Sequence, residues 1–161
     1  MTRPAPIVCL DLNVLVAGLL DQVSRRPSPG PPRQIVQGVW SGRCRPVMDD
    51  AMLDRLGDVL ARPHLRIPAD ARANFLAALT LLREPAPPDL LPPPPAALTS
   101  DPEDDAVLWC ALAHGAEWLV TGNTRHLAAL TPLAAQLVRD AHLRIATPRD
   151  FLAYQEAGGA R

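Results

Sequence analysis

The chain has 161 residues, of which 48 % are hydrophobic, and its mean hydropathy is +0.03. Its formal net charge is −1 at pH 7, because 17 acidic residues nearly balance 16 basic ones. These values are typical of a globular protein and exclude a membrane-embedded or disordered chain, so we expect a single domain that covers residues 1–161.

The residue inventory excludes further classes of protein. All 16 basic residues are arginines, whereas phosphate-binding loops of the Walker type and receiver domains of two-component signalling need a lysine. The apolar stretch Ile7–Leu20 is interrupted by Asp11 and Asn13 and is too short to span a bilayer, so we expect neither a signal peptide nor a membrane anchor. The three cysteines are odd in number and widely spaced, which favours reduced core thiols and a cytoplasmic protein.

Strands and helices alternate along the first half of the chain. Between the first two helices, a proline-rich loop is expected at 25–33, because no regular element crosses so many prolines. In chain order, the apolar spacing predicts strand Pro6–Leu10, helix Leu12–Leu20, helix Gln34–Trp40, strand Cys44–Met48, helix Asp50–Ala61 and helix Ala69–Arg83.

The second half continues the alternation after a stiff, proline-rich connection at 84–98. It predicts helix Pro102–His114, strand 117–120, helix His126–Gln136, strand Leu143–Ala146 and helix Pro148–Tyr154. Strands separated by helices indicate an α/β fold with a mostly parallel sheet that is covered on both faces.

Polar residues from distant parts of the sequence are expected at one edge of this sheet. Asp11 directly follows the first strand, and Asn123 follows the strand at 117–120 through the turn Thr121–Gly122–Asn123. Asp104 shares a helical face with apolar residues, so its side chain should point inward from the start of its helix. Carboxylates placed in this way bind Mg²⁺ or Mn²⁺, and such an ion can activate water against a phosphodiester.

The acidic residues around Asp104 also have a purely structural interpretation. Ser100 and Glu103 have the spacing of a capping box, and acids at a helix start interact favourably with its dipole. Capping explains Asp101 and Glu103, and it also offers a role for Asp105. It does not explain the direction of Asp104.

Basic residues gather in a different stretch of the chain. Five arginines and no acid lie between Gln22 and Met48, and Arg25, Arg26 and Arg33 surround the proline-rich loop. Guanidiniums beside an acidic pocket are what a metal-dependent nuclease needs to hold phosphates. Two solvated surfaces of opposite charge would give the same pattern.

These segments together resemble the PIN domain, and in particular the VapC-type ribonuclease toxins of toxin–antitoxin modules. "VCLDLNVLVAGLL" resembles the opening strand and helix of the family, "VMDDAMLDRLGDVLARPHL" its middle segment, "DPEDDAVLWCALAHGAEWLVTGNTRHL" its second half, and "IATPRDFLA" its ending. The resemblance implies a three-layer α/β/α sandwich and metal-dependent cleavage of RNA. It implies Asp11 as the first metal carboxylate, supported by Asn13, and Asp104 as a second. Beside these family positions, Asp101 and Asp49 are further ligand candidates.

The chain departs from the family pattern at two positions. Arg55 stands where the family carries a glutamate, and Asn123 stands where it most often carries an aspartate. Asp49, at the start of the middle helix, could replace the lost glutamate but fits an N-cap better. Because a guanidinium pairs well with carboxylates, we expect Arg55 to lie within salt-bridge reach of Asp11 or Asp104 and to weaken metal binding.

Two functions follow from these observations. The first is a metal-dependent ribonuclease that uses Asp11 and Asp104 with Mg²⁺ or Mn²⁺. The second is a PIN-like domain that binds RNA or a protein partner without cleavage. The expected partners are RNA, an antitoxin protein and a second copy of the chain, with no membrane.

Overall fold

The computed structural model describes residues 4–125 and 129–158 of the chain. At its centre is a sheet of four parallel strands in the order β2-β1-β3-β4. The strands are β1 (Ile7–Leu10), β2 (Arg45–Val47), β3 (Trp118–Val120) and β4 (Arg144–Ala146). Leu10 pairs with Val120, and Val120 pairs with Ala146, so the carboxyl ends of three strands lie level at one edge.

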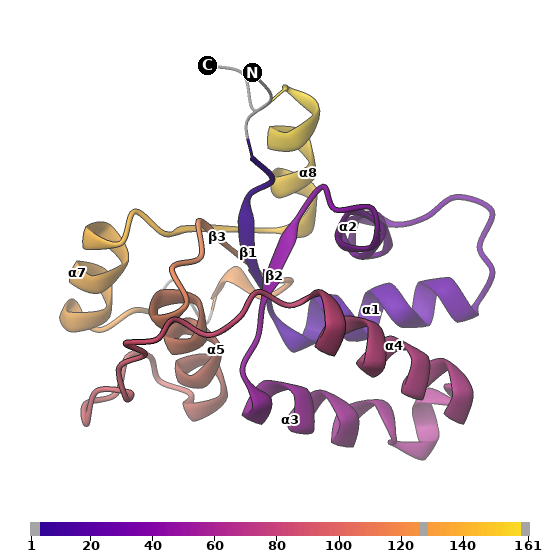
Figure 1. Cartoon of the computed structure of the whole chain (residues 1–161), viewed down its shortest axis with the longest axis horizontal. Coiled ribbons are helices and arrows are strands. Elements are labelled where there is room, and N and C mark those ends of the chain that lie inside the picture. Colours follow the sequence, from indigo (N-terminus) through magenta and orange to yellow (C-terminus); the bar gives the residue numbers. More distant parts are fainter. Residues whose placement is uncertain (1–3, 126–128, 159–161) are drawn as a thin grey trace.

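Helices cover the sheet and give the expected three-layer α/β/α arrangement. Figure 1 shows α5 and α7 on one side of the strands and α1, α2 and α4 on the other. The helices are α1 (Leu12–Val23), α2 (Pro31–Trp40), α3 (Asp50–Leu60), α4 (Ala69–Leu82), α5 (Pro102–Ala113), α7 (Pro132–Asp140) and α8 (Pro148–Glu156), with a 3₁₀ turn, η1, at Pro63–Leu65. No helix in the described ranges is long and apolar enough to cross a membrane.

Two predicted segments differ from the structure. The loop expected at 25–33 ends earlier, because Pro31 and Pro32 form the first turn of α2, where a proline's missing N–H costs nothing. The helix expected at His126–Gln136 is displaced: α7 begins at Pro132, behind the N-cap Thr131, and continues to Asp140. Residues 126–128 lie outside the described part of the chain.

The hydrophobic core contains the three cysteines, which are all buried and free of disulfides, as predicted. A hydrogen bond with Cys110 together with burial raises the pKa of the Cys9 thiol well above its ordinary value. Burial likewise raises the pKa of Cys44. Cys9 and Cys44 therefore stay protonated and pack as small apolar side chains.

Candidate functional site

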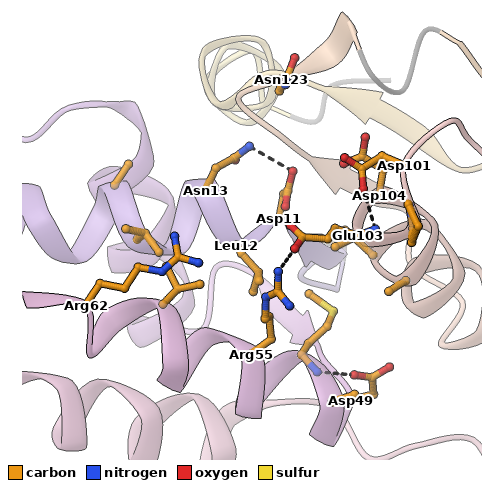
Figure 2. Close-up of a pocket in the computed structure, with 18 of the residues that line it drawn as sticks. Asp11, Leu12, Asn13, Asp49, Arg55, Arg62, Asp101, Glu103, Asp104 and Asn123 are labelled. Carbon is orange, nitrogen blue, oxygen red and sulfur yellow. Dashed lines mark hydrogen bonds and ion pairs between the residues drawn. The ribbon is translucent and has the colours of Figure 1, made fainter. Parts of the chain in front are cut away.

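Asp11 lies at the carboxyl end of β1 and at the start of α1. Its backbone N–H donates to the carbonyl of Val120, which continues the pairing of β1 with β3. The carboxylate makes no capping bond to α1. Instead, its Oδ2 accepts from Thr121 Oγ1 at 2.7 Å. It also accepts from Asn13 Nδ2 at 3.1 Å, as Figure 2 shows. Two uncharged donors from different elements therefore hold this carboxylate at the sheet edge.

The turn after β3 completes this network. Thr121 is fully buried, and its hydroxyl also accepts from the backbone N–H of Asn123 at 3.1 Å. The N–H of Gly122 donates to Oδ1 of Asn13 at 3.1 Å. The turn thus orients Asp11 through its hydroxyl and its backbone, while Figure 2 shows the Asn123 side chain directed away from Asp11.

Four acids lie at the start of α5, one at the N-cap and three in the first turn, and they have different contacts. Asp101 is the N-cap and accepts from the N–H of Glu103 at 2.8 Å, so the capping box expected at Ser100 is wrong by one residue. Asp104 is partly buried and lines the same pocket as Asp11 and Asp101. Of these carboxylates, Asp101 is already engaged in capping its own helix.

The fourth acid of this stretch, Asp105, faces the preceding loop. Its carboxylate accepts from the backbone N–H groups of Leu98 and Thr99 and from the Thr99 hydroxyl. Desolvation raises the pKa of Asp105, but these three hydrogen bonds outweigh it and hold the pKa below the ordinary value of 3.8. Asp105 therefore anchors the loop that positions the start of α5.

The start of α3 faces this acidic turn. Asp49 accepts from the N–H of Met52 at 2.7 Å, which confirms it as the N-cap of α3. The guanidinium of Arg55 pairs with Glu103 on α5, as Figure 2 shows. The expected partners Asp11 and Asp104 are thus replaced by Glu103, because this glutamate extends from the exposed side of α5 toward α3.

A pocket of about 800 Å³ joins these elements. It brings together the site residues Asp11, Asn13, Asp49, Arg55, Asp101, Asp104 and Asn123, and it also contains Glu103 and Arg62. Arg62 was not among the sequence candidates. It follows the C-cap of α3, so helical spacing from Arg55 gives no signal for it, and only the packing of α1 near α3 places it at the pocket.

The arginines expected to bind RNA lie elsewhere. None of these arginines lines the pocket. Arg25 and Arg26 belong to the connection between α1 and α2, and Arg33 lies in the first turn of α2. Arg26 approaches Asp21 at 3.9 Å, and its carbonyl accepts from Arg33 Nη1 at 3.3 Å. Since α1 has 12 residues and a helix rises 1.5 Å per residue, this segment lies about 18 Å along α1 from Asp11. Their role in RNA binding stays a prediction.

The donor set fits a divalent ion only in one coordination mode. Among the described residues, no three histidines, cysteines, aspartates or glutamates gather closely enough to hold a metal. The expected ligand set of Asp11, Asp104 and Asp101 therefore does not form a closed cage. Mg²⁺, however, commonly binds through one or two carboxylates together with water and substrate phosphates. Asp11 and Asp104 offer carboxylates for this open mode.

The electrostatics of the pocket suit a phosphate that is bound together with a cation. Five carboxylates and two guanidiniums line it, which leaves a formal excess of three negative charges. Helices α1, α3 and α5 all begin here, and helix N-termini favour anions.

The comparisons with known proteins agree with this geometry. Residues 7–125 match the family described as the PIN domain, and this range contains Asp11, Arg55, Asp104 and Asn123. No curated protein and no solved structure gives a match. Because the family match spans well over half of the sequence, this chain belongs to the PIN domain family.

Proposed function

We propose that the protein is a metal-dependent ribonuclease that hydrolyses RNA phosphodiester bonds with Mg²⁺ or Mn²⁺. The observation that carries this proposal is the Asp11 carboxylate, fixed at the sheet edge by Thr121 and Asn13 and facing the same pocket as Asp104. Membership of the PIN domain family, a nuclease-type fold, supports it.

Asp11 is well prepared to hold a cation. Its two hydrogen bonds both use Oδ2, and within the described part of the chain Oδ1 accepts none. The two donors are uncharged, so they bring no positive charge that would repel a metal. Asp11 and Asp104 would hold the ion, which would activate a water molecule and neutralise charge on the phosphodiester.

Arg55 has a place in this mechanism as a phosphate-binding residue. Its side chain is 48 % exposed and that of its partner Glu103 is 65 % exposed, so their ion pair contributes at most about 1 kcal/mol. An entering phosphate can therefore take the place of Glu103. The planar guanidinium would then orient the substrate through two parallel hydrogen bonds.

A nuclease assay tests the proposal. Wild type should cleave RNA with Mg²⁺ or Mn²⁺ and lose this activity when the metal is chelated. Asp11→Asn should abolish cleavage without loss of folding, because it removes a charge but hardly changes volume. Asp54→Asn is the matched control, since Asp54 is exposed on α3 and outside the pocket. Undiminished cleavage by Asp11→Asn would overturn the assignment.

A second candidate function is RNA binding without cleavage. It is favoured by the Arg55–Glu103 ion pair, which puts a fixed positive charge into the pocket, and by the lack of a three-residue metal cluster in the described ranges. Wild type that binds RNA but does not cleave it with either metal would establish this alternative.

The biological setting that we propose is a toxin–antitoxin module in the cytoplasm. The segments that resemble VapC-type toxins support it, with an antitoxin protein and a second copy of the chain as partners. Expression in a bacterial host should then arrest growth, and Asp11→Asn should relieve the arrest. Growth arrest that persists in Asp11→Asn would contradict a toxin that acts by cleavage.

A further inference from the structure

The pocket at Asp11 continues as a groove between α1 and α3. Both helices begin at the sheet edge, and they contact each other. One wall of the groove is Leu12, Val16, Ala17 and Leu20 of α1, and the other is Ala51, Met52 and Val59 of α3. From Leu12 to Leu20 the groove follows α1 for about 12 Å. It is therefore an apolar channel that leads away from the carboxylates.

Arg62 stands at the far end of this groove. It directly follows the C-cap of α3, is exposed, and extends its guanidinium into the groove (Figure 2). In contrast to Arg55, it forms no ion pair or side-chain hydrogen bond within residues 4–125 and 129–158. The seven-residue spacing puts the two arginines about 10 Å apart along the helix. One cation thus lies beside the carboxylates and a second, uncompensated one lies at the groove's exit.

We propose that this groove binds the stretch of single-stranded RNA that flanks the bond to be cleaved, with Arg62 holding a backbone phosphate. The inference rests on the proposed ribonuclease function and assigns the path of its substrate. A phosphate at Arg62 and another at Arg55 would run the backbone along α3. The bases would then pack against the apolar side chains of α1.

The chemistry of the walls selects a single strand over a duplex. Unpaired bases can turn out of the backbone and pack on apolar surfaces or on guanidinium planes, whereas duplex RNA presents mainly phosphates and 2′-hydroxyls. A duplex would therefore form few favourable contacts with apolar walls that carry the two arginines Arg55 and Arg62. The volume of about 800 Å³ is of the size that accommodates a drug-sized ligand, or about two nucleotides.

RNA binding measured without divalent metal tests the proposed path of the RNA along the groove independently of cleavage. The probe is a fluorescently labelled, unstructured oligoribonucleotide in EDTA, titrated with wild type, Arg62→Gln and Arg149→Gln over a range of salt concentrations. Arg149 is the matched control because it is exposed, on α8, and outside the groove. Arg62→Gln should weaken binding and lower the log–log salt slope by about 0.7, the value for one phosphate of a single strand, whereas Arg149→Gln should leave it unchanged.

A steric variant tests the apolar wall. Ala17→Phe should narrow the groove midway between Asp11 and Arg62, and it should weaken RNA binding while leaving the salt slope nearly unchanged. Thermal unfolding of each variant confirms that it is folded. RNA binding that is strong in wild type but unaffected by Arg62→Gln and Ala17→Phe would overturn the groove inference and leave the ribonuclease proposal intact. Wild type that binds no RNA in EDTA would also overturn the groove inference, whereas the ribonuclease proposal is decided by the nuclease assay with metal. Preference for a duplex of the same sequence would refute the single-strand assignment.

Discussion

Replacing Arg55 with glutamate should strengthen metal binding, because it changes both the charge and the partner of a pocket residue. In the wild type, Arg55 forms an ion pair with Glu103 at the edge of the pocket that holds Asp11 and Asp104. Arg55→Glu removes one positive charge, adds one negative charge and releases Glu103.

The size of the effect follows from the charges. A unit charge about 8 Å from a divalent ion is worth about 1 kcal/mol in water-like surroundings, and screening at physiological ionic strength lowers this to roughly 0.4 kcal/mol. Two units of charge therefore contribute about 0.8 kcal/mol. Glu103 carries the same charge before and after the substitution, so the total stays near 0.8 kcal/mol, or about a fourfold increase in affinity.

Calorimetric titration of Mn²⁺ and Mg²⁺ into wild type and Arg55→Glu measures this directly. Arg62→Glu is the control, because it makes the same charge change about 10 Å further along the groove, where the field on the ion is weaker. Adding Asn123→Asp to Arg55→Glu should increase affinity further only if the new side chain turns toward Asp11. Equal affinities of wild type and Arg55→Glu would show that Arg55 does not act on the metal site, and an equal increase in Arg62→Glu would show a general charge effect.

Two further predictions concern residues that position the site. Thr121→Val should lower metal affinity and cleavage by about 10- to 100-fold, because it removes a hydrogen-bond donor to the Asp11 carboxylate. Metal titration and the nuclease assay check this, and unchanged metal affinity would mean that Thr121 only packs. Asp105→Asn should cost about 1–3 kcal/mol of stability at neutral pH. Because the folded-state pKa of Asp105 is lowered, its carboxylate stabilises the fold above the unfolded-state pKa, and this contribution disappears as the pH falls through the folded-state pKa. Urea unfolding should therefore show a wild-type advantage at pH 7 that shrinks below about pH 4, and a constant difference would refute the argument.

The strands were predictable because their signal is local. Four short, mostly apolar runs become four parallel strands, and Asp11 follows the first of them, so the sheet edge could be located from the sequence. The helix boundaries were harder to predict near prolines, because a proline disrupts the interior of a helix but fits its first turn. Pro31 reads as a break in the sequence, yet it starts α2 because the first helical turn needs no N–H donor.

The contacts of long side chains could not be predicted in the same way. Helical spacing placed Arg55 beside the site, but its partner depends on how α3 and α5 approach each other, and the nearest acid there is Glu103. Arg62 was missed for a related reason: it follows the end of α3, and only the packing of α1 against α3 makes it part of the groove. These contacts depend on how the helices pack against each other, and the spacing of residues along one helix does not determine that packing.

The aspartates at the starts of α1, α3 and α5 differ in whether they cap their own helix. Asp49 and Asp101 each accept a backbone N–H of their own helix, which is the ordinary use of an aspartate at an N-cap. Asp11 occupies the same position before α1 but makes no such bond. A missing cap costs a helix about 1 kcal/mol. The fold instead uses Thr121 and Asn13 to hold the Asp11 carboxylate in the pocket, an arrangement that local helix stability does not explain and that a cation-binding role does.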